Sequence, residues 1–142
     1  MTALMITTKK IEIKTSGEND IVNITDKIQS LINDSDAVEG NVVLFLQSTT
    51  SALTIIEYEG GLLTDIPNAL NRIAPKSGQY EHERAYHDGN GHSHVRSSII
   101  GASLTIPFSK KTLLLGTWQQ IVLMEFDVPA RTRSLIVQIV SG

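Results

Sequence analysis

The strongest constraint on the fold of this chain is the series of short apolar segments in its carboxyl-terminal part. Residues 104–108, 113–115, 118–126 and 134–140 are rich in apolar and β-branched side chains, and polar or glycine-containing turns separate them. Three earlier segments also indicate strands: residues 9–15, which alternate around Ile11 and Ile13, and residues 41–46 and 53–59. Strands are therefore expected towards both ends of the chain.

Helices are predicted between these strands. Thr25 is a typical N-cap residue, Asp26 follows in the first turn, and apolar residues recur at helical spacing up to residue 32. A second helix is expected to begin at Thr64 or Asp65, with Pro67 near its first turn. Residues 95–100 are compatible with either a helix or a strand, and the polar residues 76–90 between these segments are predicted to form a long loop.

This order of elements predicts an α+β fold with antiparallel or mixed sheets. Neither a repeat nor a linker divides the chain, so we expect one domain over residues 1–142. A Rossmann fold is not expected, because no glycine-rich turn joins a strand to a helix.

Composition excludes several kinds of function. The net charge of −3 gives no basic excess for nucleic acid, and the absence of cysteine excludes disulfides and thiolate metal ligands. The apolar runs are too short to span a bilayer, and residues 1–14 do not resemble a signal peptide. We therefore expect a cytoplasmic protein that binds neither membranes nor nucleic acids.

All four histidines lie between His82 and His94, together with Asp88 and Asn90. Imidazole and carboxylate ligands suit Zn²⁺ and other first-row metals, whereas carboxylate and amide oxygens suit Mg²⁺. The segment therefore predicts a divalent-metal or phosphate site. The alternative is a polar surface loop whose histidines have no role.

The backbone conformation decides which side chains of this segment meet. In an extended backbone His92 and His94 share one face, which favours chelation of a metal. In a helix His92 aligns with Arg96 and His94 with Ser98, which favours a mixed site that binds an anion.

Two further segments are candidate binding elements. Residues 48–51, which begin with Ser48 and Thr49, offer hydroxyl groups after a buried strand; these either bind phosphate or bond the local backbone. Residues 116–120 place Trp118 beside Gln119, so that an indole wall and an amide either bind a flat heterocycle or fill the core.

Five segments fall in the order of a known protein family: residues 46–59, 87–94, 98–105, 116–121 and 137–140. The most specific of them is the Gly-Thr-Trp-Gln motif at 116–119. On these residues the chain resembles the YjbQ-type family of secondary thiamine-phosphate synthases. The resemblance implies an α+β sandwich with a buried helix, assembled as a homotrimer. It also implies weak thiamine-phosphate synthase activity, in which hydroxymethylpyrimidine diphosphate and thiazole phosphate are joined and pyrophosphate is released.

The resemblance and this chemistry assign roles to matching positions. The expected metal ligands are His82, Asp88, His92 and His94, and the expected catalytic residues are Glu57, Asp88 and Arg96. The expected substrate- or phosphate-binding residues are Ser48, Thr49, Asn90, Ser103, Thr117, Trp118 and Gln119. The expected cofactor is a divalent metal, zinc or magnesium.

The sequence departs from many bacterial relatives at three positions. Ser48 stands where they have histidine, and Ile56 and Tyr58 stand where they have asparagine, whereas Glu57 is kept. This pattern resembles an archaeal branch of the family. Two alternatives to the synthase stay open: a metal-dependent phosphatase or hydrolase, and a non-catalytic protein that binds a metal or a phosphorylated metabolite.

Overall fold

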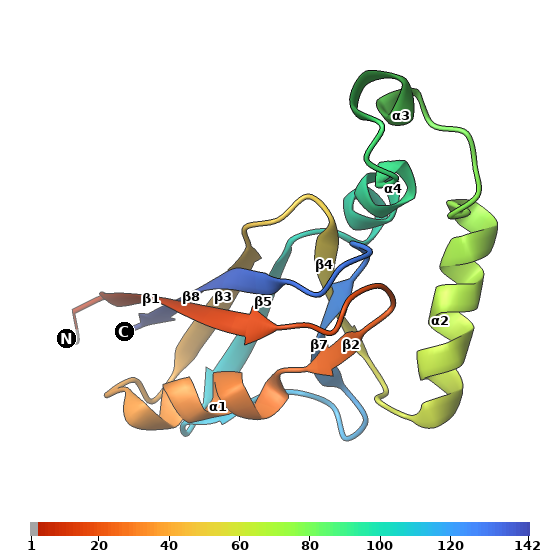
Figure 1. Cartoon of the computed structure of the whole chain (residues 1–142). Coiled ribbons are helices and arrows are strands. Elements are labelled where there is room, and N and C mark those ends of the chain that lie inside the picture. The colour runs from red at the N-terminus through yellow and green to blue at the C-terminus, as the bar shows by residue number, and fades with distance from the viewer. Residues whose placement is uncertain (1–2) are drawn as a thin grey trace.

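Eight strands and four helices follow one another along residues 3–142, the part of the chain that the computed structural model describes (Figure 1). The first two residues of the expected 1–142 domain lie outside the described residues. The strands are β1 (Met5–Lys14), β2 (Ile21–Asn23), β3 (Gly40–Leu46), β4 (Ser51–Ile56), β5 (Ser103–Ser109), β6 (Thr112–Leu113), β7 (Gln120–Glu125) and β8 (Thr132–Ser141). The helices are α1 (Thr25–Asp34), α2 (Gly60–Ile73), α3 (Glu81–Tyr86) and α4 (Gly91–Ile100).

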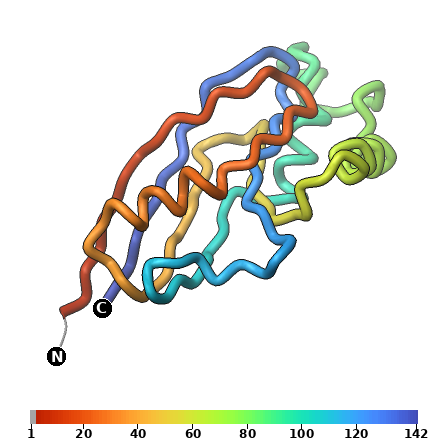
Figure 2. The backbone as a smooth tube through the Cα atoms, turned by 90° about the horizontal axis from the view of Figure 1, so that it is seen from below, coloured from red at the N-terminus to blue at the C-terminus, as the bar shows by residue number. Residues whose placement is uncertain are grey.

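The strands form two sheets, and each strand pairing within residues 3–142 is antiparallel. The larger sheet has the order β1-β8-β3-β5-β6, and the smaller has the order β2-β7-β4. The chain ends lie side by side because Met5 of β1 pairs with Ser141 of β8 (Figure 2). The predicted α+β class is therefore confirmed, with antiparallel sheets.

Strand β7 is buried on both faces. Ile121 and Leu123 point into the main core, which the larger sheet and α1 complete, whereas Val122 and Met124 point into a second core beneath α2. Side chains alternate between the faces of a strand, so the smaller sheet is a middle layer with apolar packing on each side. The loops at the two ends of this sheet are therefore anchored by a buried layer.

Several boundaries differ from the sequence prediction. Helix α2 begins at Gly60 rather than near Asp65, because the carboxylate of Glu59 accepts hydrogen bonds from the backbone N–H groups of Gly61 and Leu62 and caps the helix. Pro67 consequently lies inside the helix instead of in its first turn. The predicted loop at 76–90 contains α3, and residues 95–100 belong to a helix, α4.

A buried ion pair ties the two sheets together. Arg133 of β8 donates from Nε to Oε2 of Glu125 on β7 at 2.8 Å, and its Nη2 bonds the other carboxylate oxygen and the hydroxyl of Thr50. Glu125 is 0% exposed. Burial raises the pKa of Glu125, although the hydrogen bonds from Arg133 act in the opposite direction.

Within residues 3–142, no helix is long and apolar enough to cross a membrane.

Replacing Arg133 should destabilise the fold strongly. Arg133→Met leaves the buried Glu125 carboxylate without its partner, and we expect the free energy of unfolding to fall by about 3–5 kcal/mol in urea denaturation. The matched control is Arg84→Met, because Arg84 and its partner Glu81 on α3 are both largely exposed and surface pairs contribute about 0–1 kcal/mol. Equal losses in the two variants would contradict this role for the buried pair.

Candidate functional site

A tight turn between α3 and α4 shapes the histidine-rich segment. His87 and Gly89 adopt left-handed backbone conformations, with φ of +52° and +71°. The carboxylate of Glu83 accepts hydrogen bonds of 2.7 Å from the N–H groups of both Gly89 and Gly91. These two bonds hold the pKa of Glu83 below its ordinary value. Gly91 packs so closely on Tyr80 that a Cβ there would lie 2.5 Å from that of Tyr80, so the turn tolerates no side chain at this position.

The turn brings three of the four predicted metal ligands together. One ligand atom from each of His82, Asp88 and His94 lies within 4.8 Å of the others. The rings of His82 and His94 have centroids 4.5 Å apart, and Nε2 of His82 lies 3.2 Å from the Asp88 carboxylate. The backbone N–H of Asn90 holds the pKa of Asp88 below its ordinary value, so this carboxyl group is kept as an anion. We call these three side chains the His82–Asp88–His94 group.

The donor chemistry of this group fits a divalent first-row metal. Two imidazoles and one carboxylate are the ligands found in catalytic zinc sites, where three protein ligands leave one position for water or substrate. Both imidazoles are half-buried and the carboxylate is exposed, so a small molecule has access to the group.

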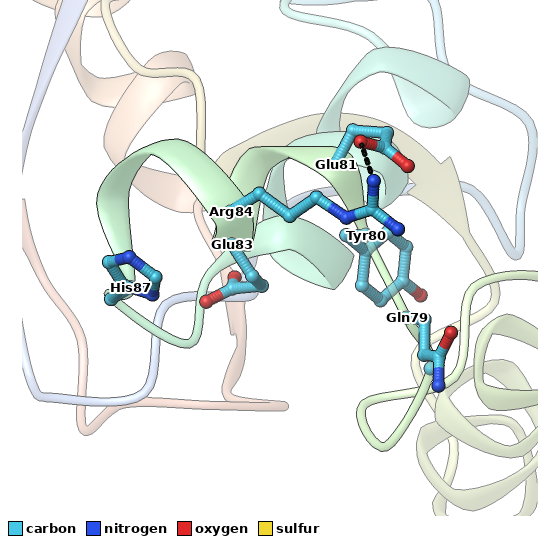
Figure 3. A pocket seen from close by; sticks show the side chains of 7 residues that line it. Gln79, Tyr80, Glu81, Glu83, Arg84 and His87 are labelled. Atoms are coloured by element: carbon cyan, nitrogen blue, oxygen red, sulfur yellow. Dashed lines mark ion pairs between the residues drawn. The ribbon is translucent and has the colours of Figure 1, made fainter.

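A hollow of about 640 Å³ lies on another part of α3 (Figure 3). Tyr80, Glu83, Arg84 and His87 line it, and Arg84 pairs with Glu81 at 3.2 Å. None of the His82–Asp88–His94 group is among its lining residues. The hollow and the candidate metal centre are therefore separate features, because only His82 of the metal group belongs to α3, whereas Asp88 lies in the following turn and His94 on α4.

His92, the fourth predicted ligand, lies elsewhere. Because residues 91–100 are helical, His92 and His94 point about 160° apart around α4. His92 is 1% exposed, and its Nε2 bonds Oε1 of Glu18 at 2.8 Å. The predicted His92–His94 chelate does not form in this chain. The helical alternative holds instead, with His92 on the same buried face as Arg96.

Glu18 was not predicted as a site residue. Its carboxylate binds His92 through Oε1 and Lys76 through Oε2, the latter at 2.7 Å. Burial acts to raise the pKa of Glu18, but the hydrogen bonds and charges of Lys76 and His92 outweigh it and hold the pKa below 4.5. No local sequence pattern links Glu18 to a histidine 74 residues further along the chain.

A second polar group surrounds Asp127, which sequence reasoning also missed. Asp127 accepts hydrogen bonds from Asn90, Thr50 and Arg131, so it joins the start of α4 to the hydroxyl-rich loop at 48–51. Burial acts to raise the pKa of Asp127, and its hydrogen bonds, with Arg131 first, lower it overall. This end of the smaller sheet therefore brings three separate loops together.

The loop at 48–51 bonds its own backbone and also borders a hollow. Oγ of Ser48 accepts hydrogen bonds from the N–H of Thr50 and the hydroxyl of Ser51, as the capping alternative predicted. Ser48, Thr49 and Arg133 border a hollow of about 640 Å³. Ser103 lies close by, because it begins β5 opposite Phe45 of β3.

Four other predicted site residues lie at the opposite end of the smaller sheet. Strands β4 and β7 pair from Ser51 with Glu125 to Ile56 with Gln120, a span of roughly 17 Å at about 3.3 Å per residue. The residues just beyond Ile56 and just before Gln120 therefore lie far from the His82–Asp88–His94 group; they are Glu57, Thr117, Trp118 and Gln119. Trp118 is 71% exposed, so it does not fill the core. Oε1 of Gln119 accepts a hydrogen bond from Gly116 and closes the local turn.

Comparison with known proteins places this geometry in context. The family model described as "UPF0047 protein YjbQ-like" matches residues 9–142. A UPF0047 protein of Archaeoglobus fulgidus is 36% identical over 129 residues, which cover 91% of this chain and 98% of that protein. The UPF0047 protein YugU of Bacillus subtilis is 30% identical over 92% of this chain and 96% of its own length.

Solved structures have the same fold. A YbjQ-like protein of unknown function from Sulfolobus solfataricus superposes with a TM-score of 0.91 at 27% identity, covering 99% of this chain and 100% of that chain. A conserved protein of the yjbq/upf0047 family from Clostridium acetobutylicum superposes with a TM-score of 0.82 at 33% identity, covering 92% of this chain and 98% of that chain.

The pair of Glu18 and His92 should make the free energy of unfolding decrease at acidic pH. The folded pKa of Glu18 lies below 4.5, so its stabilising contribution is present above pH 4.5 and is lost as the pH falls through the folded value. We expect Glu18→Gln to flatten this part of the dependence in urea unfolding followed from neutral to acidic pH. Glu12→Gln, at an exposed position on β1, should leave the dependence unchanged. Indistinguishable acid profiles for wild type and Glu18→Gln would refute the assignment.

Proposed function

The chain belongs to the YjbQ-like UPF0047 family, and on that basis we propose that it is a metal-assisted enzyme that acts on a phosphorylated small molecule. The reaction proposed is thiamine-phosphate synthesis, which joins hydroxymethylpyrimidine diphosphate to thiazole phosphate and releases pyrophosphate. The observation that supports it best is the His82–Asp88–His94 group, whose three ligand atoms lie within 4.8 Å of one another on an accessible surface.

The reaction needs what this group offers. Negative charge accumulates on the pyrophosphate oxygens as the bond to carbon breaks, and a divalent cation, when bound, neutralises that charge. His82 and His94 would hold the cation through ring nitrogens and Asp88 through a carboxylate oxygen. The lowered pKa of Asp88 keeps that oxygen free of a proton.

The loop at 48–51 is the proposed phosphate-binding element. Ser48 Oγ accepts two hydrogen bonds, so its own hydroxyl proton is available to donate to a ligand. Thr49 borders the same hollow and adds a hydroxyl, and Arg133 lies at its edge with its charge paired to Glu125. The bonds from Asn90 through Asp127 to Thr50 connect this element to the turn that carries Asp88.

The distant motif residues require a second copy of the chain in this proposal. Glu57, Thr117, Trp118 and Gln119 lie at the far end of the smaller sheet, beyond the reach of the His82–Asp88–His94 group of the same chain. The homotrimer that the resemblance implies would let a neighbouring copy supply the exposed Trp118 and its neighbours. The molar mass from light scattering of the assayed sample is the direct check on this assembly.

The metal content of variants should show that His94 is a metal ligand and that His92 is not. We expect untagged wild-type protein to bind zinc stoichiometrically and the His82→Ala/His94→Ala variant to lose it, because two of three ligands are removed. His92→Gln should keep the metal. Its free energy of unfolding should fall by about 1–3 kcal/mol, because His92 bonds Glu18 in a buried position. Retained zinc in the double variant, or its loss in His92→Gln, would rule out this assignment of ligands.

Turnover assays should distinguish the three candidate functions, which are a synthase, a phosphatase and a binding protein. The synthase predicts pyrophosphate release only when both precursors and the metal are present, and loss of that release in His82→Ala/His94→Ala. A phosphatase would release inorganic phosphate from a single substrate. A binding protein would show a thermal shift with a precursor and no product. Each of the last two outcomes would overturn the proposed synthase reaction.

A further inference from the structure

A second polar pocket lies on the other side of α4 from the His82–Asp88–His94 group. It has a volume of about 730 Å³ and opens between α2, the turn after β1 and the segment that follows α2. The side chains that matter here are those of Glu18, Asn68, Asn71, Lys76, Ser77 and Arg96. The sequence assigned Arg96 a catalytic role, but the structure places it in this pocket, on the buried face of α4 with His92. The proposed synthase reaction at the His82–Asp88–His94 group therefore uses none of these side chains.

Arg96 forms the floor of this pocket and is only partly satisfied by the protein. The residue is 2% exposed. Nε donates to the carbonyl of Ala74 at 2.9 Å, and Nη2 donates to Oδ1 of Asn71 at 3.2 Å. Within residues 3–142, the third nitrogen, Nη1, has no hydrogen-bond partner. Every fully buried side-chain polar atom of these residues is satisfied, so Nη1 reaches the surface of the pocket that Arg96 lines.

A purely structural role for Arg96 explains two of its nitrogens but not the third. The bonds to Ala74 and Asn71 hold the carboxyl-terminal end of α2 against α4. A buried guanidinium is costly unless its N–H groups are bonded, and burial lowers the pKa of Arg96. A ligand acceptor in the pocket would complete its bonding.

The other walls supply further donors. Oδ1 of Asn71 accepts from both Arg96 and the backbone N–H of Lys76, so its Nδ2 is left to donate. Nζ of Lys76 donates one proton to Glu18 and retains others. Asn68 and Ser77 add an amide and a hydroxyl. The donors therefore outnumber the acceptors that the pocket itself provides.

The charges around the pocket also favour an anion. Lys76 and Arg96 contribute two positive charges against the single negative charge of Glu18. Both Glu18 oxygens are already bonded, one to Lys76 and the other to His92, which orients the carboxylate towards cationic and N–H groups. A group with one negative charge would balance the remainder.

We propose that this pocket binds a small metabolite through a single oxyanion, a phosphate or a carboxylate, held by Arg96 and Lys76. Asn68 and Asn71 donate to the same ligand and select groups with several acceptor oxygens. The site is independent of the metal centre, because His92 and Arg96 occupy the buried face of α4 while His94 lies on the opposite face.

The test is calorimetric titration with inorganic phosphate and, in a second arm, with acetate. Both titrations use metal-free protein carrying His82→Ala/His94→Ala, so binding to the metal centre does not contribute. We expect saturable binding of at least one anion. Binding of phosphate alone identifies a phosphorylated ligand, and binding of acetate alone identifies a carboxylate. Absence of saturable binding of either anion would overturn the proposal, whatever the outcome for the synthase.

Variants locate the binding site. Lys76→Met, at an exposed position, should weaken binding by about tenfold, since a hydrogen bond to a charged group contributes about 1.5–3 kcal/mol. Asn68→Asp, also exposed, replaces a donor with a negative charge and should weaken binding as well. Lys14→Met removes the same charge from β1 and should leave the affinity unchanged. Equal affinities in Lys76→Met, Asn68→Asp and Lys14→Met would place the anion elsewhere and overturn the proposal.

Discussion

The architecture depends on the burial of strand β7 on both of its faces. Ile121 and Leu123 complete the core under the larger sheet, and Val122 and Met124 complete the core under α2. Where the apolar alternation ends, Glu125 falls on the side of the larger sheet and meets Arg133 of β8. An unpaired charge at that depth would be strongly unfavourable, so this pair constrains how the two sheets align.

The polar groups at this end of β7 follow from the same placement. Two residues beyond Glu125, Asp127 accepts hydrogen bonds from Asn90 at the start of α4 and from Thr50 in the loop at 48–51. Loops that are distant in the sequence therefore converge on one carboxylate. The turn that carries Asp88 is held at its other side by Glu83, which bonds the N–H groups of Gly89 and Gly91.

Helix α4 separates two kinds of chemistry by its periodicity. Its outward face presents His94 to His82 and Asp88, a donor set that suits a divalent metal. Its inward face presents His92 to Glu18 and Arg96 to the polar pocket beside α2. A metal centre and an anion pocket on opposite faces of one helix would allow two ligands to bind without competing. A movement of α4 would change the geometry of both sites.

The sequence by itself determined the α+β class and most strands, and it singled out the histidine-rich segment as the candidate metal site. Alternating and β-branched runs such as residues 134–140 report burial locally, and three of the four proposed ligands do lie together. Local signals were weaker at helix ends: Glu59 caps α2 from a position that read as the end of a strand. Local patterns also did not indicate where the motif at 116–119 would lie. Its distance from His94 depends on the register of β4 with β7.

Only the tertiary structure decided which side chains meet. The choice between an extended and a helical backbone at residues 91–100 rotated His92 away from His94, and packing against β4 buried that face. Glu18, Glu125 and Asp127 gained their roles from partners far along the chain or in the opposite sheet. Periodicity in a sequence records which residues are buried. It does not record which buried charges face one another, because that depends on how separate elements pack.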